Sequence, residues 1–293
     1  MYDLFAFIFQ NSFLLRGCVL FVFGAIIGSF LNVVIYRLPI MLKHKWRDEC
    51  LELLGEDCSI NDEHIDSLSF NLIYPGSHCP ACKEKIPFWS NIPIFGYLLL
   101  RGKCYKCRGK ISLRYPAIEL LTGILFIIAG HFYNETVTLS ACLVFISFII
   151  VIMLIDYDTR ILPDELTLLL LWLGLLFNLY GQIAGSLGNA VIGAVVGYVF
   201  LWLVFWIFKL ITKRDGMGYG DFKLLAAILA FCGYGAISPV ILIASVMGIL
   251  YFMIGKLAGK FTNDHQIPFG TFLGIGGIIV LLGEKYLYIF SLN

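Results

Sequence analysis

Charged side chains are scarce in this sequence. Only 14% of its 293 residues are Asp, Glu, Lys or Arg, whereas 59% are hydrophobic, and a soluble globular domain carries about 25% charged residues. This scarcity excludes an ordinary soluble protein and indicates a chain that lies in a lipid bilayer. The net charge is only +1, and phosphate binding needs a dense basic surface, so a nucleic-acid partner is not expected.

Two further features are missing. The N-terminal stretch MYDLFAF carries no basic residue, and no small-residue cleavage site follows the first apolar run, which makes a cleavable signal peptide the weaker interpretation of that run. The sequence also contains no internal repeat and no low-complexity linker.

Long apolar runs recur along the chain. Each of the longer ones has the roughly 20 residues that a helix needs to cross a ~30 Å hydrocarbon core, although 222–234 is short. We therefore predict an all-α polytopic membrane protein with about eight transmembrane helices. The predicted spans are 13–38, 116–132, 138–156, 166–183, 187–212, 222–234, 237–256 and 269–290.

Basic residues concentrate between the first two predicted spans. Twelve of the 21 Lys and Arg residues lie from Arg37 through Arg114, which predicts that this segment faces the cytoplasm and that the N-terminus lies outside. The chain then divides into a first transmembrane helix (1–39), a cytoplasmic insert (40–115) and a helical bundle (116–293).

The beginning of the insert has helical spacing. Trp46, Cys50, Leu53 and Leu54 recur at helical intervals in HKWRDECLELLGED, which predicts a short surface helix. The acidic run that continues through Asp66 is interpreted as a solvated face.

Four cysteines of the insert form two C-x2-C pairs. Cys79 and Cys82 are separated from Cys104 and Cys107 by a 21-residue spacer, close to that of zinc ribbons, where each turn presents two thiolates to one tetrahedral Zn²⁺. The alternatives are two disulfides, reduced thiols that only pack, or His78 as a substitute ligand, and a cytoplasmic location disfavours disulfides. Four thiolates would close the coordination shell, so the metal would be structural.

Two carboxylates stand at membrane boundaries, where ionisable groups are costly and therefore candidates for function. Asp156 ends the apolar run SFIIVIMLI, and Asp221 begins the sixth span, so both are predicted at the inner membrane boundary. Two carboxylates within a few ångströms share a proton, and one can activate a water while the other protonates a carbonyl oxygen. The pair predicts peptide-bond hydrolysis by an aspartic dyad.

The glycines before Asp221 have a predicted purpose. Gly216, Gly218 and Gly220 would permit positive φ and leave room for an extended substrate to approach. Asp164 is typical of an N-cap or first-turn carboxylate, and Asp221 taken alone could be an N-cap too.

Other acidic residues near the spans have plainer interpretations. Asp158 and Glu165 are interpreted as loop charges at the membrane surface. Glu119, near the start of the second span, is interpreted as a packing residue paired with Arg114.

Five motifs make the sequence similar to the prepilin peptidases, also called type IV leader peptidases, in order over nearly the whole chain. They are GSFLNVVIYRLP (28–39), CPAC with CYKC, RYPAIELLTG (114–123), IDYDTRILPDELT and GMGYGDFKLL. The resemblance implies a bifunctional aspartic protease of the GxGD class in the bacterial inner membrane. Such an enzyme cleaves the leaders of type IV prepilins and type II secretion pseudopilins on the cytoplasmic side. It then N-methylates the new N-terminus with S-adenosylmethionine.

The resemblance also assigns residues. It implies that Asp156, which opens D-x-D-x-x-x-L-P-D, and Asp221, in GxGD, are the catalytic aspartates, with Asp164 structural or auxiliary. The cysteines of CPAC and CYKC match the family's zinc ligands, and Gly102, in LLLRGKC, matches a glycine associated with methyl transfer. The methylation prediction rests on the resemblance, because no Gly-rich strand-to-helix motif of a Rossmann methyltransferase is present.

Two other functions remain open. A proton- or cation-coupled transporter could use Asp156 and Asp221 as a relay, but it would be expected to carry carboxylates at several membrane depths. The other is a zinc-stabilised methyltransferase or adaptor without protease activity, for which the bundle is only an anchor.

Overall fold

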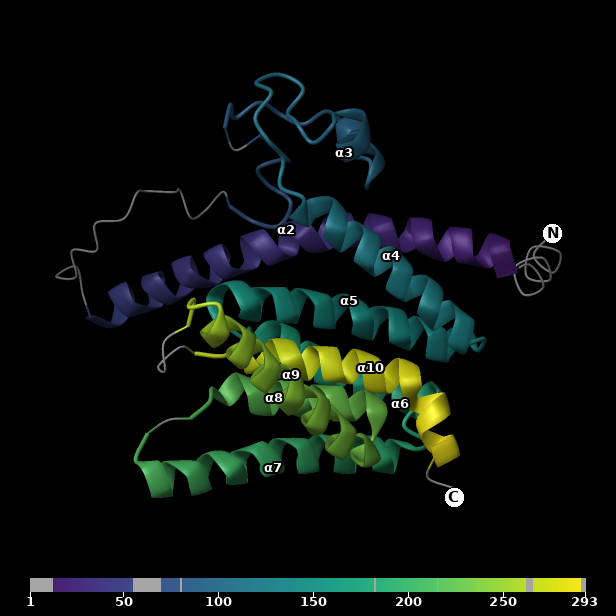
Figure 1. Ribbon diagram of the computed structural model, residues 1–293, viewed down its shortest axis with the longest axis vertical. Coiled ribbons are helices and arrows are strands. Elements are labelled where there is room, and N and C mark those ends of the chain that lie inside the picture. The colour runs from purple at the N-terminus through teal and green to yellow at the C-terminus, as the bar shows by residue number, and fades with distance from the viewer. Residues whose placement is uncertain are drawn as a thin grey trace. The chain divides into compact units, whose positions relative to one another are not determined.

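The protein is built almost entirely of helices (Figure 1). The computed structural model describes residues 13–54, 70–79, 81–181, 183–214, 216–261 and 266–290. Long helices in these ranges are α2 (Phe13–Leu54), α4 (Arg114–Phe132), α5 (Thr136–Thr159), α6 (Asp164–Gly181), α7 (Leu187–Thr212), α8 (Tyr219–Cys232), α9 (Ile237–Leu257) and α10 (Phe269–Phe290). Shorter elements are α3 (Phe95–Leu99) and the 3-10 turns η1 (Phe88–Asn91) and η2 (Tyr234–Ala236).

The predicted all-α polytopic architecture is confirmed. Each predicted span corresponds to one long helix, and within the described ranges six helices are long and apolar enough to cross a membrane. α8 has only 14 residues, so it is too short to span by itself. Pairing between extended segments, in the same ranges, is confined to two isolated bridges, His78 with Lys85 and Lys103 with Lys110.

The first helix is longer than predicted. α2 continues through Pro39 to Leu54, so the predicted end at residue 38 is wrong, as is the prediction of a separate surface helix after it. Proline removes one helical hydrogen bond, but the Leu, Met, Lys, Arg and Glu residues that follow are good helix formers. The predicted surface helix is therefore the continuation of α2.

The chain forms two compact units, whose boundaries fall within α2 and α4. We call residues 1–20 with 125–293 the bundle unit and residues 21–124 the cysteine unit.

α8 is the central helix of the bundle unit. It packs against α6, α7 and α10, and every residue from Leu224 to Cys232 is buried. An apolar helix without a polar face must be covered either by other helices or by lipid, and α8 is covered by helices. The short α8 is therefore surrounded by protein, while the longer α7 exposes large apolar side chains such as Val195, Ile207 and Leu210.

Glycines allow the helices to approach α8 closely. A Cβ on Gly193 of α7 would lie 2.6 Å from the carbonyl oxygen of Leu229, and a Cβ on Gly174 of α6 would lie 2.7 Å from the Phe231 ring. Small residues at helix contacts are the usual means of close packing in membrane proteins. The position of α8 therefore depends on these glycines.

The cysteine unit uses α2 and α4 as its base. A Cβ on Gly28 of α2 would lie 2.8 Å from the Cα of Glu119 in α4, so the two helices are in backbone contact there. Buried Arg37 of α2 donates hydrogen bonds to the carbonyl oxygens of Asn71 (2.8 Å) and Pro75 (2.6 Å). These bonds tie the segment that leads to the first cysteine pair to α2.

Replacing Gly193 by alanine should destabilise the bundle unit by about 1–3 kcal/mol, the usual cost of overpacking. The atoms that the new methyl group would meet are backbone atoms of Leu229, Gly233 and Tyr234, which cannot rotate away. The measurement is thermal unfolding of the detergent-purified protein. Gly188→Ala in the same helix is the matched control, because its Cβ would meet only Ser186 Oγ at 3.7 Å. Equal melting temperatures for the two variants would contradict this account.

Candidate functional site

Asp156 and Asp221 are both buried in the bundle unit. Asp156 lies in the last turn of α5 and is 4% exposed, and Asp221 is the third residue of α8 and is 7% exposed. α5 ends where Arg160 adopts a left-handed conformation (φ 58°, ψ 25°), and α8 begins after extended Gly218 (φ −82°, ψ 151°). The N-cap of α8 is thus Gly218, and Asp221 is a first-turn residue.

The carboxylate of Asp156 is held by the start of α10. Its Oδ2 atom accepts the backbone N–H of Thr271 at 2.7 Å and lies 3.0 Å from the Thr271 hydroxyl. The first N–H groups of a helix have no partner within the helix, so Asp156 caps α10 from another element. Both contacts fall on Oδ2, which leaves Oδ1 for a second partner.

The Thr271 hydroxyl has a choice of acceptors. Its Oγ1 atom is 3.0 Å from the carbonyl oxygen of Met153 as well as 3.0 Å from Asp156 Oδ2. A hydroxyl group carries one proton and can also accept, so Thr271 can donate to either oxygen. This residue can therefore adapt to Asp156 with or without a proton on its carboxyl group.

Leu162 connects the segments that carry the two carboxylates. A Cβ on Gly220 would lie 2.6 Å from Leu162 Cβ, and a Cβ on Gly270 would lie 3.0 Å from the Leu162 methyl groups and 3.1 Å from Asp156 Oδ2. The beginnings of α8 and α10 and the turn before α6 therefore meet at one point. Asp156 at the end of α5 and Asp221 in the first turn of α8 thus both lie on segments that border Leu162.

The glycines before Asp221 differ from their predicted conformation. The prediction of positive φ is wrong, because none of the three is in the left-handed region. Gly216 instead packs against the Phe208 ring, which its Cβ would approach to 2.6 Å, and Gly220 packs against Leu162. Around Gly218 there is space, because the nearest atom to its Cβ would be Asp221 Oδ2 at 3.9 Å. Close packing, rather than backbone freedom, accounts for two of the three.

Asp164 links α6 to α8. Both of its carboxylate oxygens accept hydrogen bonds from Lys223 Nζ at 2.7 Å, and Lys223 lies two residues after Asp221. The side chains are 28% (Lys223) and 54% (Asp164) exposed, so the pair contributes only about 0–1 kcal/mol to stability. Asp158 and Glu165 are exposed at the surface of the bundle unit.

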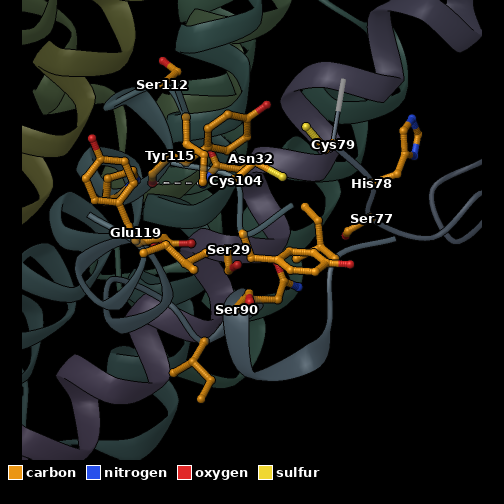
Figure 2. A pocket seen from close by; sticks show the side chains of 18 of the residues that line it. Ser29, Asn32, Ser77, His78, Cys79, Ser90, Cys104, Ser112, Tyr115 and Glu119 are labelled. Carbon is orange, nitrogen blue, oxygen red and sulfur yellow. Dashed lines mark hydrogen bonds between the residues drawn. The ribbon is translucent and has the colours of Figure 1, made fainter. Parts of the chain in front are cut away.

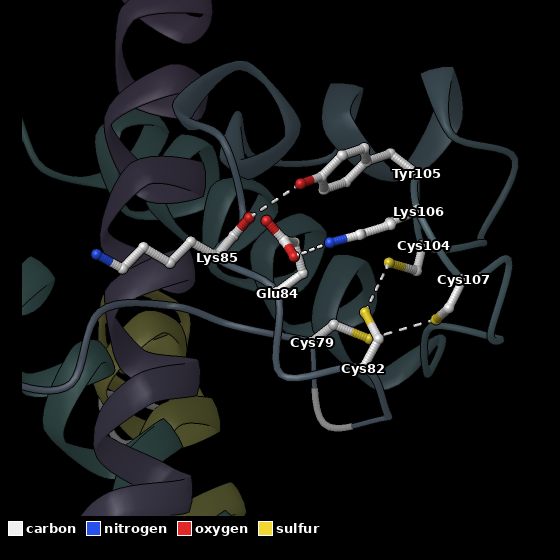
Figure 3. A network of polar contacts seen from close by, with 8 residues as sticks. All are labelled: Cys79, Cys82, Glu84, Lys85, Cys104, Tyr105, Lys106 and Cys107. Atoms are coloured by element: carbon white, nitrogen blue, oxygen red, sulfur yellow. Dashed lines mark hydrogen bonds and ion pairs between the residues drawn. The ribbon is translucent and has the colours of Figure 1, made fainter.

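The four cysteines of the insert come together in the cysteine unit. Figure 3 shows their sulfur atoms turned toward one another, and all four lie within 4.8 Å. The Sγ atoms of Cys79 and Cys107 are 3.8 Å apart, and those of Cys82 and Cys104 are 4.0 Å apart. A tetrahedral ion with metal–sulfur bonds of ~2.3 Å separates its ligands by about 3.8 Å. The group could therefore hold a metal ion.

The two cysteine turns have matching backbones. Cys79 N–H bonds to Glu84 O and Lys83 N–H to Cys79 O, and in the second turn Cys104 N–H bonds to Gly109 O and Arg108 N–H to Cys104 O. Lys83 and Arg108, each directly after the second cysteine of its pair, have φ of 56° and 59°. Such turns direct backbone N–H groups at the sulfur atoms.

The backbone of the first turn favours a thiolate at Cys79. The N–H groups of Cys82 and Ala81 lower the pKa of the Cys79 thiol to about 6. A deprotonated sulfur is the form that binds metal ions. All eight described cysteines are free thiols, which disfavours the disulfide alternative. His78 does not belong to the four-sulfur group; its Nδ1 atom lies 3.0 Å from Gly76 O.

Gly102 and Glu119 belong to the cysteine unit, whereas Asp156 and Asp221 belong to the bundle unit. Gly102 has a φ of +69° and packs against Tyr97. Glu119, for which the sequence predicts a pairing with Arg114, accepts the N–H of Ile94 at its Oε2 atom (2.7 Å).

Thr271 is the residue that sequence reasoning missed. It follows Asp156 by 115 positions, and a threonine in the first turn of a helix has no sequence feature that links it to a distant carboxylate. The only sequence feature near it that could suggest such a contact is the preceding Gly270, because a glycine before a polar first-turn residue is compatible with a close approach by another group.

Fold and site together define a polytopic α-helical membrane protein with two buried carboxylates in its bundle and a separate four-cysteine centre. A model of the bacterial peptidase A24 N-terminal domain matches residues 22–133, and a model of the type IV leader peptidase family matches residues 143–253. The chain belongs to the type IV leader peptidase family.

Similar proteins named prepilin leader peptidase/N-methyltransferase occur in several bacteria. The one from Aeromonas hydrophila is 46% identical over 267 residues, which cover 90% of this chain and 89% of that protein. The one from Neisseria gonorrhoeae is 45% identical over 260 residues, 88% of this chain and 87% of that protein. The one from Legionella pneumophila is 40% identical over 260 residues, 88% of each. No solved structure matches the chain.

Replacing Thr271 by valine should lower stability by about 1–3 kcal/mol, because a buried polar group loses its hydrogen-bond partner. Valine keeps the shape of threonine and the backbone N–H that Asp156 accepts. Thr271→Ser, which keeps the hydroxyl, should remain near the wild type. Thermal unfolding in detergent measures both, and a valine variant as stable as the wild type would show that the hydroxyl contacts are unimportant.

Proposed function

We propose that this protein is a bifunctional enzyme of the bacterial inner membrane that cleaves the leader peptide of type IV prepilins and type II secretion pseudopilins and then N-methylates the new N-terminal residue. The observation that supports the peptidase part is that two buried carboxylates, Asp156 of α5 and Asp221 of α8, lie on segments that converge at Leu162. Family membership and the names of the curated relatives support both activities.

Asp156 and Asp221 act as an aspartic dyad in this proposal. Two neighbouring carboxylates share one proton, so one of them takes a proton from water while the other gives its proton to the carbonyl oxygen of the scissile bond. The water oxygen attacks the carbonyl carbon, the carbon–nitrogen bond then breaks, and the leaving nitrogen takes up a proton. Thr271 fixes Oδ2 of Asp156, which leaves Oδ1 to exchange protons.

The neighbouring residues have supporting roles in this proposal. The space at Gly218 next to Asp221 admits an extended peptide, and close packing of Gly216 and Gly220 sets the path of the backbone into α8. Asp164 is auxiliary, because its bond to Lys223 holds the beginnings of α6 and α8 together.

The concentration of basic residues from Arg37 to Arg114 supports an orientation. In it the N-terminus lies outside, and the insert (40–115) and the start of the bundle (116–293) that carries Asp156 and Asp221 face the cytoplasm. The basic leader of a precursor would then reach the dyad from the cytoplasmic surface, while its apolar helix stays in the lipid.

Zinc is the metal that fits the four-cysteine group best, because four thiolates at tetrahedral separations are typical of structural zinc. Cys79, Cys82, Cys104 and Cys107 would hold it and leave no position for a water, so its contribution is to cross-link the two turns. S-adenosylmethionine, when bound, would supply the methyl group for the new α-amino nitrogen.

Replacing either Asp156 or Asp221 by asparagine should reduce cleavage of a purified prepilin at least about a thousandfold, as loss of an essential acid or base does. Gel separation of precursor and product measures the rate. Asp158→Asn, an exposed position in the same motif, is the control and should cleave normally. Normal cleavage by either dyad variant would remove that residue from the mechanism. No cleavage by the wild type, under conditions where it is folded, would favour a transporter or an adaptor.

The double variant Cys79→Ser/Cys104→Ser should lose its bound metal, because it removes one thiolate from each turn. Elemental analysis of the purified protein is expected to give about one zinc per wild-type chain and none in the variant. The control is Cys142→Ser, a buried cysteine of α5 outside the four-sulfur group. Full retention of zinc by the double variant would exclude the four-cysteine site.

A further inference from the structure

A cavity of about 380 Å³ lies within the cysteine unit (Figure 2). Its walls come from α2, from the segment 90–100 with α3, from the two cysteine turns and from the start of α4. Sites for small organic molecules have volumes of roughly 300–1,000 Å³. The cavity is therefore large enough for one such molecule and is distinct in sequence from the aspartate pair.

The cavity carries one buried carboxylate. Glu119 is 8% exposed, and among the lining residues that the structure describes it is the only acidic one. Its Oε2 atom accepts the N–H of Ile94, and the Ser29 side chain is a second hydrogen-bond donor to the carboxylate. Two donors still leave part of the capacity of a carboxylate unused, because its two oxygens offer about four acceptor sites. A buried carboxylate in an open cavity favours a ligand that brings a positive charge.

Two neutral polar groups in the wall also have unused hydrogen-bonding capacity. The Ser90 hydroxyl oxygen is buried and has no hydrogen bond within the described part of the chain, and an unsatisfied buried hydroxyl is unfavourable. The Asn32 amide uses its nitrogen for the carbonyl oxygens of Gly28 (3.1 Å) and Tyr115 (3.2 Å), so its side-chain oxygen remains as an acceptor. Both groups suit a ligand with hydroxyl and amino groups.

Aromatic rings form much of the remaining wall. Tyr97, Tyr105 and Tyr115 line the cavity, and tyrosine rings stack on planar heterocycles and attract cations to their faces. Lys110, also in the lining, offers a positive charge for an anionic group. A ligand that combines a cation, a carboxylate, a heterocycle and several hydroxyl groups matches this set of side chains.

We infer that this cavity binds the methyl donor S-adenosylmethionine. The donor has a sulfonium and an ammonium group for Glu119, a carboxylate for Lys110, ribose hydroxyls for Ser90 and Asn32, and an adenine ring for the tyrosines. The inference deepens the proposed function, since it rests on this protein being an N-methyltransferase. The apolar side chain of a precursor is a poorer match, because it would leave the charge of Glu119 unmatched and the Ser90 hydroxyl without a partner.

Glu119 also shapes the wall that it faces. Ile94, whose N–H it accepts, has a φ of 63° and a ψ of −52° at the start of α3, a strained conformation for a β-branched residue. The bond to Glu119 holds this conformation, and α3 then places Tyr97 in the wall. A ligand that binds the Glu119 carboxylate therefore also affects the position of Tyr97.

Gly102 lies directly behind Tyr97. Its φ of +69° disfavours other residues, and a Cβ there would be 2.6 Å from the Tyr97 hydroxyl and 2.8 Å from Tyr97 Cζ. Substitution of Gly102 must displace the tyrosine ring. A glycine outside the lining thus controls the shape of the cavity, which gives Gly102 a positioning role.

The test measures binding of radiolabelled S-adenosylmethionine and of S-adenosylhomocysteine to the full chain in detergent by equilibrium dialysis. Glu119→Gln should weaken donor binding at least tenfold, as loss of a charge-assisted hydrogen bond does. The same change should weaken binding of S-adenosylhomocysteine, which lacks the sulfonium charge, by the same factor or by less. Ser90→Ala, a milder change, should weaken binding about two- to tenfold.

Gly102→Ala should also weaken binding at least tenfold, because Tyr97 is displaced. Gly259→Ala is the matched control, because Gly259 has a similar φ of +67° but nothing within 4 Å of its Cβ. Bound zinc and the melting temperature show whether each variant is folded. Ultraviolet cross-linking of the labelled donor, followed by peptide mapping, should mark peptides between residues 29 and 119.

The outcomes separate the inference from the function on which it rests. If the wild-type protein and the three variants bind the donor equally well, this cavity is not the donor site, and the methyltransferase proposal remains intact. A cross-linked label outside residues 29–119 has the same consequence. A folded wild-type protein that neither binds the donor nor methylates a cleaved prepilin overturns both.

Discussion

The hydrogen bond between Asp156 and the first turn of α10 is the contact on which the arrangement of the bundle unit depends. A carboxylate buried among apolar helices needs hydrogen-bond donors, and the first N–H groups of a helix need an acceptor. Thr271 and Asp156 satisfy both needs with one contact. Because α5 and α10 also pack along their lengths, this contact sets the register of α10 and the direction of the Asp156 side chain.

The position of Asp221 has a different origin. α8 is covered by α6, α7 and α10, and close approach at glycines decides how it is seated. The ion pair of Lys223 with Asp164 is partly exposed and contributes about 0–1 kcal/mol, whereas a single overpacked contact costs about 1–3 kcal/mol. Packing therefore contributes more than the ion pair to the position of Asp221. The Lys223–Asp164 pair makes a smaller contribution to the position of the first turn of α8.

The cysteine unit combines a four-sulfur centre with a cavity of about 380 Å³. Two turns of matching backbone converge their sulfur atoms to within 4.8 Å, and Cys79 and Cys104 also contribute to the cavity wall. The proposed zinc ion would fix that wall with respect to both turns. The opposite wall depends on Glu119, Ile94 and Tyr97, which are linked by one hydrogen bond and one strained residue. The proposed methyl donor would then bind between two walls. Zinc would cross-link the wall of the cysteine turns, and the charge of the donor would act on the wall that contains Glu119.

Local patterns in the sequence determined the helical membrane class, the eight helices, the cysteine centre and the two aspartates as candidates, because hydropathy and short motifs act over a few neighbouring residues. The continuation of α2 through Pro39 was not predictable in this way, since the apolar pattern stops while helix propensity continues. Only tertiary structure decided that Thr271 meets Asp156, that Gly216 and Gly220 serve packing, and that Ser90, Asn32 and Glu119 share one cavity. These relations join residues far apart in the chain, and their spacing along the sequence carries no information about distance in the fold.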